Sequence, residues 1–189
     1  MNLVHRWLCS SGRWRRTVEQ HVVPWVLDGL DPGPRVLEVG PGYGAATDVL
    51  RTRLPHLTCV EIDPSLARSL ARRAGPGRVD VVCGDGTALP LPAASFDAAL
   101  CFTMLHHVTP PERQDRLLKE VARVLRPGGV FLGVDSLESP LLRRLHWFDT
   151  LEPVDPSRFA GRLRAAGFAH AEVALNPYAF RFRAWKAAD

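Results

Sequence analysis

One acid and three glycines occupy every second position of the segment Glu38-Val39-Gly40-Pro41-Gly42-Tyr43-Gly44, which begins at the end of the apolar run 35–39. Glycine lets the backbone turn tightly and approach a ligand closely, because it has no Cβ. The carboxylate of Glu38, at the end of the run, can accept hydrogen bonds from a cationic or hydroxylated ligand. These residue types favour a small-molecule site at a strand-to-helix turn.

Two further carboxylates follow the next two apolar runs. Glu61 lies 23 residues after Glu38, near the ~20-residue spacing of an acid that binds ribose hydroxyls. Asp85 stands in Cys83-Gly84-Asp85-Gly86-Thr87, where a carboxylate can accept a hydrogen bond from an adenine amino group. The alternative interpretations are a solvated acid at a strand end for Glu61 and a turn aspartate for Asp85.

Alternating strands and helices must position these residues. Apolar runs predict strands at 35–39, 57–62, 79–83, 96–102, 130–134, 171–175 and 179–185, and periodicity predicts helices at 45–54, from Asp63 onward, at 111–125 and at 156–166. Strands that alternate with helices imply parallel βαβ units with right-handed crossovers. Only Asn176-Pro177 lies at the centre of the last connection, which is too short for a crossover and therefore predicts an antiparallel hairpin.

The 189 residues of the chain predict a single domain. Two of its segments lie outside the predicted strands and helices of the βαβ units. Residues 1–30 form a helical pattern with Trp7, Trp14 and Trp25 among basic residues, and we expect it to cover the sheet or the ligand cleft. A contact with a partner or a membrane surface is the alternative. The long connection 136–156 is expected to be an acceptor lid. Its side chains His146, Trp147 and Phe148 would line a substrate pocket or fill the lid's own core.

Taken together, these motifs resemble the class I S-adenosylmethionine (SAM)-dependent methyltransferases, most closely the small-molecule type, over residues 33–185. Residues 36–44 resemble the first motif of the family, and Arg123-Val124-Leu125-Arg126-Pro127-Gly128-Gly129 resembles the turn before its fifth strand. The resemblance implies an α/β fold with a Rossmann-like seven-stranded sheet. Its strand order would be 3-2-1-4-5-7-6, with strand 7 antiparallel and helices on both faces.

The resemblance also implies a cofactor and the residues that bind it. SAM would be the cofactor and S-adenosylhomocysteine (SAH) the product. The family's binding positions correspond to the methionine-binding group Glu38, Gly40, Pro41, Gly42 and Gly44, the ribose acid Glu61 with Ile62, the adenine group Asp85, Gly86 and Thr87, and Phe102 and Thr103 after the fourth strand.

Three side chains are candidates for catalysis. His106 and His107 follow the fourth strand at the ligand edge, and an imidazole near neutral pKa could remove a proton from a hydroxyl or amine acceptor. Packing or local capping is the alternative role of these histidines. Asp135 closes the fifth strand and could act as a base or recognise an amine. Methyl transfer is an in-line displacement in which the protein contributes mainly proximity and orientation.

Other chemistries are less well supported. The pattern Gly40-x-Gly42-x-x-Ala45 also fits a dinucleotide turn, but Gly44, Asp85 and the antiparallel ending favour SAM over NAD or FAD. No metal is expected, because no CxxC pair is present and the metal-binding acids of catechol-type methyltransferases have no clear match. The cysteines Cys9, Cys59, Cys83 and Cys101 are expected to be buried, reduced thiols.

Composition points to partners and location. The net charge of +4 is too small to indicate nucleic-acid binding, so no nucleic-acid partner is expected. Only two of the basic residues, Lys119 and Lys186, are lysines, which is typical of a GC-rich bacterial genome. Neither a transmembrane run nor a signal peptide is evident, so a cytoplasmic protein is expected. The prediction is a methyltransferase for a small-molecule acceptor. The alternatives are a lipid-headgroup methyltransferase at the membrane surface and a SAM-binding regulator or partner subunit without transferase activity.

Overall fold

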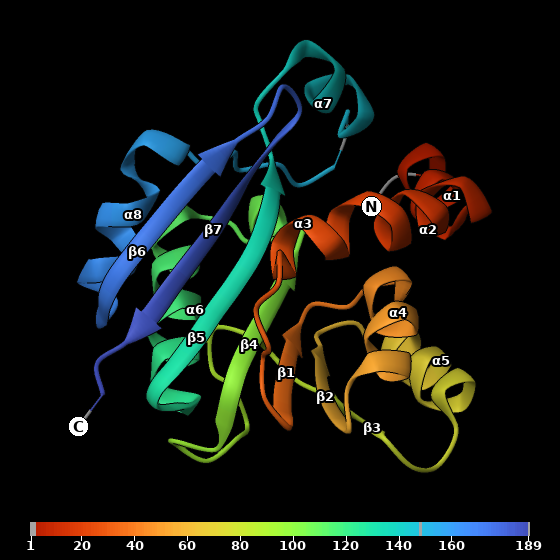
Figure 1. The fold of residues 1–189 in the computed structure, drawn as a ribbon. Helices are drawn as coiled ribbons and strands as arrows, with labels where there is room; N and C mark the ends of the chain where they lie inside the picture. Colours follow the sequence, from red (N-terminus) through yellow and green to blue (C-terminus); the bar gives the residue numbers. More distant parts are fainter. Residues whose placement is uncertain (1–2, 148, 189) are drawn as a thin grey trace.

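The computed structural model describes residues 3–147 and 149–188. Its helices pack around a single β-sheet. Within these residues seven strands run in the order β3-β2-β1-β4-β5-β7-β6 (Figure 1). Their bounds are β1 (Arg35–Val39), β2 (His56–Glu61), β3 (Val79–Cys83), β4 (Phe96–Phe102), β5 (Leu125–Ser136), β6 (Phe168–Leu175) and β7 (Ala179–Lys186). Strands β1 to β5 pair in parallel, and β7 is antiparallel to both β5 and β6. The expected order and the terminal hairpin are confirmed.

Helices cover both faces of the sheet (Figure 1). They are α1 (Leu3–Ser10), α2 (Gly12–Thr17), the π-helical turn η1 (Val18–Val22), α3 (Val23–Leu27), α4 (Ala45–Arg53), α5 (Pro64–Ala74), the 3₁₀ turn η2 (Leu105–His107), α6 (Pro111–Val124), α7 (Pro140–Leu145) and α8 (Pro156–Ala165). Asp63 caps α5 by accepting hydrogen bonds from the backbone N–H groups of Ser65 and Leu66.

The strands separate two hydrophobic cores, because successive side chains of a strand point to opposite faces. Leu37 of β1 belongs to the core formed with α6 and α8, whereas its neighbour Val36 belongs to the core formed with η1, α3, α4 and α5. Both residues are fully buried. Parallel sheets need this cover on both faces, which explains the continuous apolar runs of β1 and β4.

The N-terminal helices are fixed to the sheet. Val18, Val23 and Val26 are buried in the second of these cores. Arg181 of β7 donates hydrogen bonds to the carbonyl oxygen of Trp25 (2.7 Å) and to Asp28 (2.9 Å). Cover of the sheet by this segment, which was one of its two expected roles, is therefore observed for α3.

Two expectations about β5 and the cysteines were wrong. Residues 126–129 were expected to be a turn before the strand, but they form an irregular part of β5, since Phe96 pairs with Leu125 and Ala98 already pairs with Val130. The N–H of Gly128 donates to the carbonyl of Ala187 at 2.9 Å, which holds this irregular segment beside the end of the chain. Cys83 is exposed rather than buried, because it ends β3 at the edge of the sheet.

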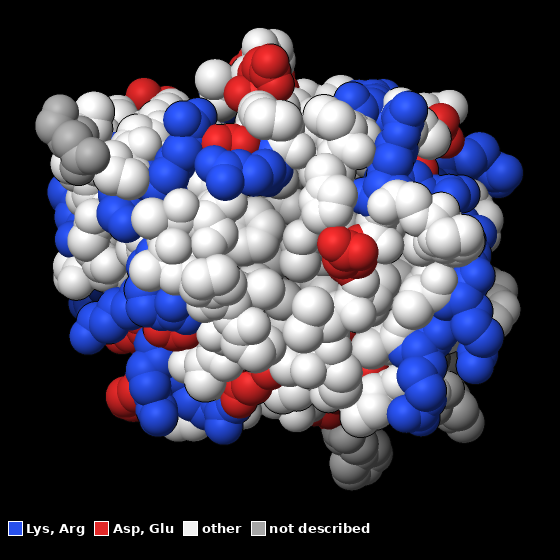
Figure 2. Space-filling view, turned by 90° about the horizontal axis from the view of Figure 1, so that it is seen from below, with Lys and Arg blue, Asp and Glu red and all other residues white. Residues whose placement is uncertain are grey.

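The face at the amino-terminal ends of the parallel strands is seen in Figure 2. Lys and Arg side chains lie mainly toward its sides, acidic side chains lie among them, and its centre carries few charges. The opposite edge of the sheet, at the carboxyl ends of the parallel strands, lies beneath α1, α2 and α7 (Figure 1). None of the helices in the part of the chain that the structure describes has the length and apolarity that a membrane crossing requires.

Candidate functional site

The glycine turn after β1 has backbone conformations that are unfavourable for residues with a Cβ. Gly40, Gly42 and Gly44 have φ angles of 66°, 55° and 73°, in the left-handed region where a Cβ is unfavourable. A Cβ at Gly40 would lie 2.6 Å from the Cε atom of Met104, so the end of the Met104 side chain would have to move to make room for it. A Cβ at Gly42 would meet no atom within 4 Å, which marks open space beside the turn.

Glu61 connects this turn to the end of β2. Its carboxylate accepts one hydrogen bond from the N–H of Gly42 (2.9 Å) and one from the N–H of Asp63 (3.0 Å). The side chain is buried but lines a cavity. Since each carboxylate oxygen accepts one of these bonds, each keeps acceptor capacity for a hydroxyl group.

The larger of two neighbouring cavities has a volume of about 700 Å³, within the ~300–1,000 Å³ range of small-molecule sites. It lies at the carboxyl ends of β1, β2 and β3. Its lining includes the predicted residues Gly40, Gly42, Glu61, Ile62, Asp85, Gly86 and Thr87. The topology therefore brings the carboxylates of two separate motifs to one cavity.

Asp85 is held by its own turn and by a cation that sequence analysis missed. It accepts a hydrogen bond from the N–H of Thr87 (2.8 Å) and pairs with the guanidinium of Arg113 at 2.6 Å. Burial acts to raise the pKa of Asp85, but the bonds from Thr87 and the charge of Arg113 outweigh it and lower this pKa. No local pattern marks Arg113, which lies on α6 and meets Asp85 only in the fold.

The smaller cavity, of about 220 Å³, is mostly apolar. The predicted residues Glu38, Gly40, Pro41, Gly42, Phe102, Thr103, His106, His107 and His146 line it together with Leu8, Cys9, Trp14, Val18, Val22, Leu142 and Leu145, which were not predicted. Thr103 has a φ of 48°, a conformation that costs free energy for a residue with a Cβ. Residues of α1, α2 and η1 thus line the same cavity as residues of α7.

Glu38 lies deep in the wall of the smaller cavity. Its carboxylate accepts hydrogen bonds from the Thr47 hydroxyl (2.7 Å) and the Cys59 thiol (3.6 Å), and its side chain is 1% exposed. Burial raises the pKa of Glu38 to about 7, despite the opposing effect of the two hydrogen bonds. A cation near this group would favour its charged form.

His106 and Asp135 form a buried pair. The ring Nδ1 and the backbone N–H of His106 both contact the carboxylate of Asp135, the latter at 3.1 Å. Burial lowers the pKa of His106, but the charge and hydrogen bond of Asp135 outweigh it, so the pKa is raised overall. Asp135 is fully buried and is absent from the lining of either cavity, so it reaches a ligand only through His106.

His146, which follows α7, joins this pair from the expected lid. Its ring centroid lies 5.0 Å from those of His106 and His107. Burial and the neighbouring His106 lower the pKa of His146, although the contact of its Nδ1 with the carbonyl oxygen of Leu142 opposes the shift. His107 lines both cavities.

Two further predicted residues, Gly44 and Trp147, lie outside both cavities. Gly44 lines neither cavity and instead caps α4, where Arg73 packs against it. Trp147 is 66% exposed and also lines neither cavity. Phe148 lies outside the described residues.

Comparison with known proteins places this geometry in context. The family model described as a methyltransferase domain matches residues 37–133. The ubiquinone/menaquinone biosynthesis C-methyltransferase of Methylobacterium nodulans is 31% identical over 169 residues, which cover 72% of this chain and 66% of that protein. The fatty-acid O-methyltransferase of Mycolicibacterium smegmatis is 42% identical over 106 residues, covering 55% of this chain and 38% of that protein.

A solved structure shares the fold. The crystal structure of a SAM-dependent methyltransferase from Methanosarcina mazei superposes with a TM-score of 0.72 at 20% identity, covering 88% of this chain and 98% of that one. The chain spans only 38% to 66% of the length of the two curated relatives named above. The matched region contains the glycine turn, Glu61, Asp85 and the two histidines of η2.

Proposed function

The chain belongs to the class I SAM-dependent methyltransferase family, and we propose that it transfers a methyl group from SAM to a small, apolar acceptor. One observation carries the proposal: the two cavities adjoin and share Gly40, Gly42, Tyr43, Met104 and His107 as lining residues. A cofactor in the larger cavity would therefore present its reactive end to the smaller one. Such juxtaposition is the main requirement of an in-line transfer.

The residues of the larger cavity fit SAM. The carboxylate of Glu61 would accept hydrogen bonds from the two ribose hydroxyls, next to Ile62. Asp85 and Thr87, on the turn that contains Gly86, would contact the adenine ring, with Arg113 holding the second oxygen of Asp85. When bound, SAM supplies an electrophilic methyl group on a sulfonium centre.

The junction of the cavities fits the methionine part of the cofactor. Open space at Gly42 leaves room beside the turn for a ligand chain, with Pro41 and Phe102 as neighbouring walls. The carboxylate of Glu38 and the backbone of Thr103 would recognise the amine. Gly44 would contribute indirectly, by starting α4 after the turn.

The smaller cavity would hold the acceptor and exclude water from it. Leu8, Trp14 and Val18 from the N-terminal helices, together with Leu142 and Leu145 of α7, provide an apolar lining. A hydroxyl or amine acceptor must also lose a proton. His106 and His107 line the cavity and could accept it, while Asp135 would fix the ring of His106.

The names of relatives support an apolar acceptor. One relative is named for quinone biosynthesis and another for fatty acids, and both compounds are largely hydrocarbon. The alignment with the fatty-acid enzyme covers 55% of this chain. We therefore assign the acceptor to the class of small lipophilic molecules.

Calorimetric titration with SAH, with NADH as the control ligand, tests the cofactor assignment. We expect micromolar binding of SAH and no binding of NADH. A folded protein that does not bind SAH would overturn the proposal, and so would one that binds NADH instead.

An acceptor screen with methyl-labelled SAM tests the proposed class of acceptor. Short-chain quinols and fatty acids would be compared with polar amines of similar size. We expect label to enter the apolar acceptors, because the lining offers them contact area. Transfer to the polar amines alone would contradict the acceptor class.

A membrane-surface enzyme is the second candidate, and one observation favours it. Large apolar side chains are exposed on α1, on or directly after α7, and at the turn between β6 and β7, all at the carboxyl edge of the sheet: Trp7, Leu141, Trp147, Leu175 and Tyr178. Exposed arginines lie nearby in sequence on α2 and α7, namely Arg13, Arg15, Arg16, Arg143 and Arg144. Sedimentation with anionic vesicles at low and high salt tests this candidate, since binding through arginine weakens with salt.

A further inference from the structure

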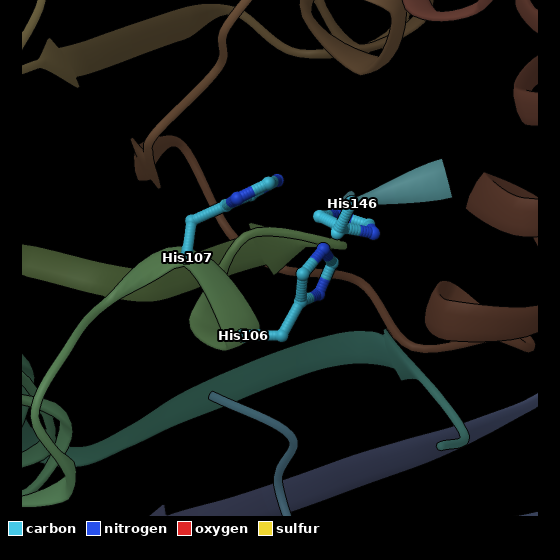
Figure 3. A group of neighbouring side chains, drawn as sticks. All are labelled: His106, His107 and His146. Carbon is cyan, nitrogen blue, oxygen red and sulfur yellow. The ribbon is translucent and has the colours of Figure 1, made fainter. Parts of the chain in front are cut away.

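Three histidine rings from two distant segments meet beside the smaller cavity (Figure 3). His106 and His107 come from η2, and His146 follows directly after α7. The ring centroids of His106 and His107 are 4.3 Å apart, and each lies 5.0 Å from that of His146. One potential ligand nitrogen from each ring lies within 4.8 Å of the other two.

Each of the three rings has its Nδ1 next to an oxygen atom. The partners are the carboxylate of Asp135 for His106, the carbonyl of Leu142 at 2.8 Å for His146, and the carbonyl of Thr150 at 3.3 Å for His107. These oxygens accept hydrogen bonds, so each Nδ1 carries a hydrogen. In a neutral imidazole the lone pair then resides on Nε2 in all three rings.

This pattern is the one that metal-binding histidines require. A ligating imidazole almost always donates its second N–H to a carboxylate or a backbone carbonyl, which fixes the ring and its tautomer. Asp135 is fully buried, and His106 and His146 are 2% and 3% exposed, so the surroundings already hold two of the rings in place. Three protein ligands with an open fourth position are typical of catalytic zinc sites.

We propose that His106, His107 and His146 form a binding site for one divalent transition-metal ion that prefers imidazole ligands, such as Zn²⁺. Tetrahedral Zn–N bonds of about 2.0–2.1 Å place the ligand nitrogens roughly 3.4 Å apart. The ligand nitrogens, which lie within 4.8 Å of one another, would have to approach by up to about 1.4 Å through small shifts of the rings. The bound ion would connect η2 to the segment after α7.

The proposal deepens the proposed function and rests on it for the role of the ion. The three histidines line the cavity assigned to the acceptor, so the open coordination position would face that molecule. An acceptor with a hydroxyl, amine or thiol group could bind there, and coordination would lower the pKa of that group, so that its proton is lost to bulk solvent as the acceptor enters the cavity. His106 and His107 would then act as ligands rather than as bases.

Metal titration of the chelator-treated protein tests the site directly. Zn²⁺ would be added in competition with a chromophoric chelator, and Co²⁺ would be followed by its visible absorption, both without SAM. We expect one ion per chain and an absorption of the intensity typical of four-coordinate Co²⁺. A protein that binds neither ion would overturn the proposal.

Two variants and one control variant test the proposed ligands and their support. His146→Ala removes a ligand from the segment after α7 and should weaken Zn²⁺ binding at least tenfold, whereas His170→Ala, an exposed histidine of β6, should leave it unchanged. Asp135→Asn removes the carboxylate behind His106 and should weaken Zn²⁺ binding about 10–100-fold and shift the Co²⁺ spectrum. Binding by His146→Ala as tight as that of the wild type would overturn the proposal.

SAH titration of the same samples separates the two proposals. It reports folding of each variant and occupation of the larger cavity independently of the metal. SAH binding without Zn²⁺ binding would refute the metal site and leave the proposed function standing. Zn²⁺ binding without SAH binding would refute the proposed function and leave the metal site standing.

Discussion

The larger and the smaller cavity are built in different ways. The larger one takes its predicted polar residues Glu61, Asp85 and Thr87 from positions at or close to the ends of β2 and β3, and later segments of the chain add Thr109, Arg113 and Asp149. The smaller one combines residues as far apart in the chain as Leu8 and His146, from helices and turns that lie on different sides of the sheet's carboxyl edge. Gly40, Gly42 and His107 belong to both.

This difference shows how one fold can keep one ligand and change another. In an open α/β sheet the strand ends and their turns are fixed by the topology, so a ligand held there is recognised by backbone geometry and a few carboxylates. The smaller cavity depends on side chains of peripheral helices, which can change without altering the sheet. We therefore expect substitutions to separate the two functions, and four predictions test that separation.

The largest effect is expected at Glu38, which lines the smaller cavity and not the larger one. Its pKa is about 7 in the folded protein, compared with an ordinary value of 4.5. The folded state therefore retains a proton that the unfolded state loses between these values, so the free energy of unfolding falls as pH rises from about 4.5 to about 7. The contribution of Glu38 to this fall is at most about 3 kcal/mol.

Urea unfolding of Glu38→Gln and the wild type between about pH 5 and pH 8 measures this contribution. The amide cannot ionise, so the variant should become more stable relative to the wild type as pH rises. Glu172→Gln, an exposed glutamate of β6, controls for the amide substitution itself. Parallel pH profiles for Glu38→Gln and the wild type would show that Glu38 is not the buried acid described here.

Loss of the Glu61 carboxylate comes next in size. Glu61→Ala removes a charged acceptor of ribose hydroxyls and should weaken SAH binding by about 1.5–3 kcal/mol, roughly 10–100-fold. Asp80→Ala changes the charge equally on the neighbouring strand β3, where the side chain is exposed, and should leave the Kd within about twofold. Equal losses in both variants, measured by calorimetry, would contradict a ribose site at Glu61.

The same difference explains what sequence analysis could predict. The strands and the acids and glycines of the larger cavity followed from local patterns, because a glycine turn or a strand-end acid is encoded within a few neighbouring positions, whereas the strand order came from the family resemblance. The irregular start of β5 at residues 126–129 could not be predicted, since Pro127 and Gly128 are typical of turns and only pairing with distant residues holds them in the strand.

Contacts between distant segments were the other gap. The pairing of Arg113 with Asp85 and the meeting of His146 with His106 and His107 depend on how α6 and the segment after α7 fold back over the sheet. Arg113 has no local pattern that distinguishes it from a surface residue. The sequence marked His106, His107 and His146 as candidates, but no local pattern predicts that their rings meet. The exposed position of Trp147 next to the buried His146 also depends on that tertiary arrangement.

A matched pair of glycines separates backbone strain from ligand space. Gly42 and Gly128 both have positive φ angles and open space where a Cβ would lie, but only Gly42 lines the cavities. An alanine should therefore lower the free energy of unfolding by about 1 kcal/mol at either position. Gly42→Ala should also weaken SAH binding about tenfold, which Gly128→Ala should not. Equal SAH affinities in the two variants would remove the glycine turn from the cofactor site.

The smallest effect on cofactor binding is expected from Trp14. This half-buried side chain of α2 lines only the smaller cavity. Trp14→Ala should leave the Kd of SAH within about twofold, because the side chain lies outside the larger cavity and substitutions at separate sites act independently. Calorimetric titration with SAH compares the Kd of Trp14→Ala with that of Glu61→Ala. If Trp14→Ala weakens SAH binding as much as Glu61→Ala does, the two cavities form one cofactor site, and the acceptor must bind elsewhere on the carboxyl edge of the sheet.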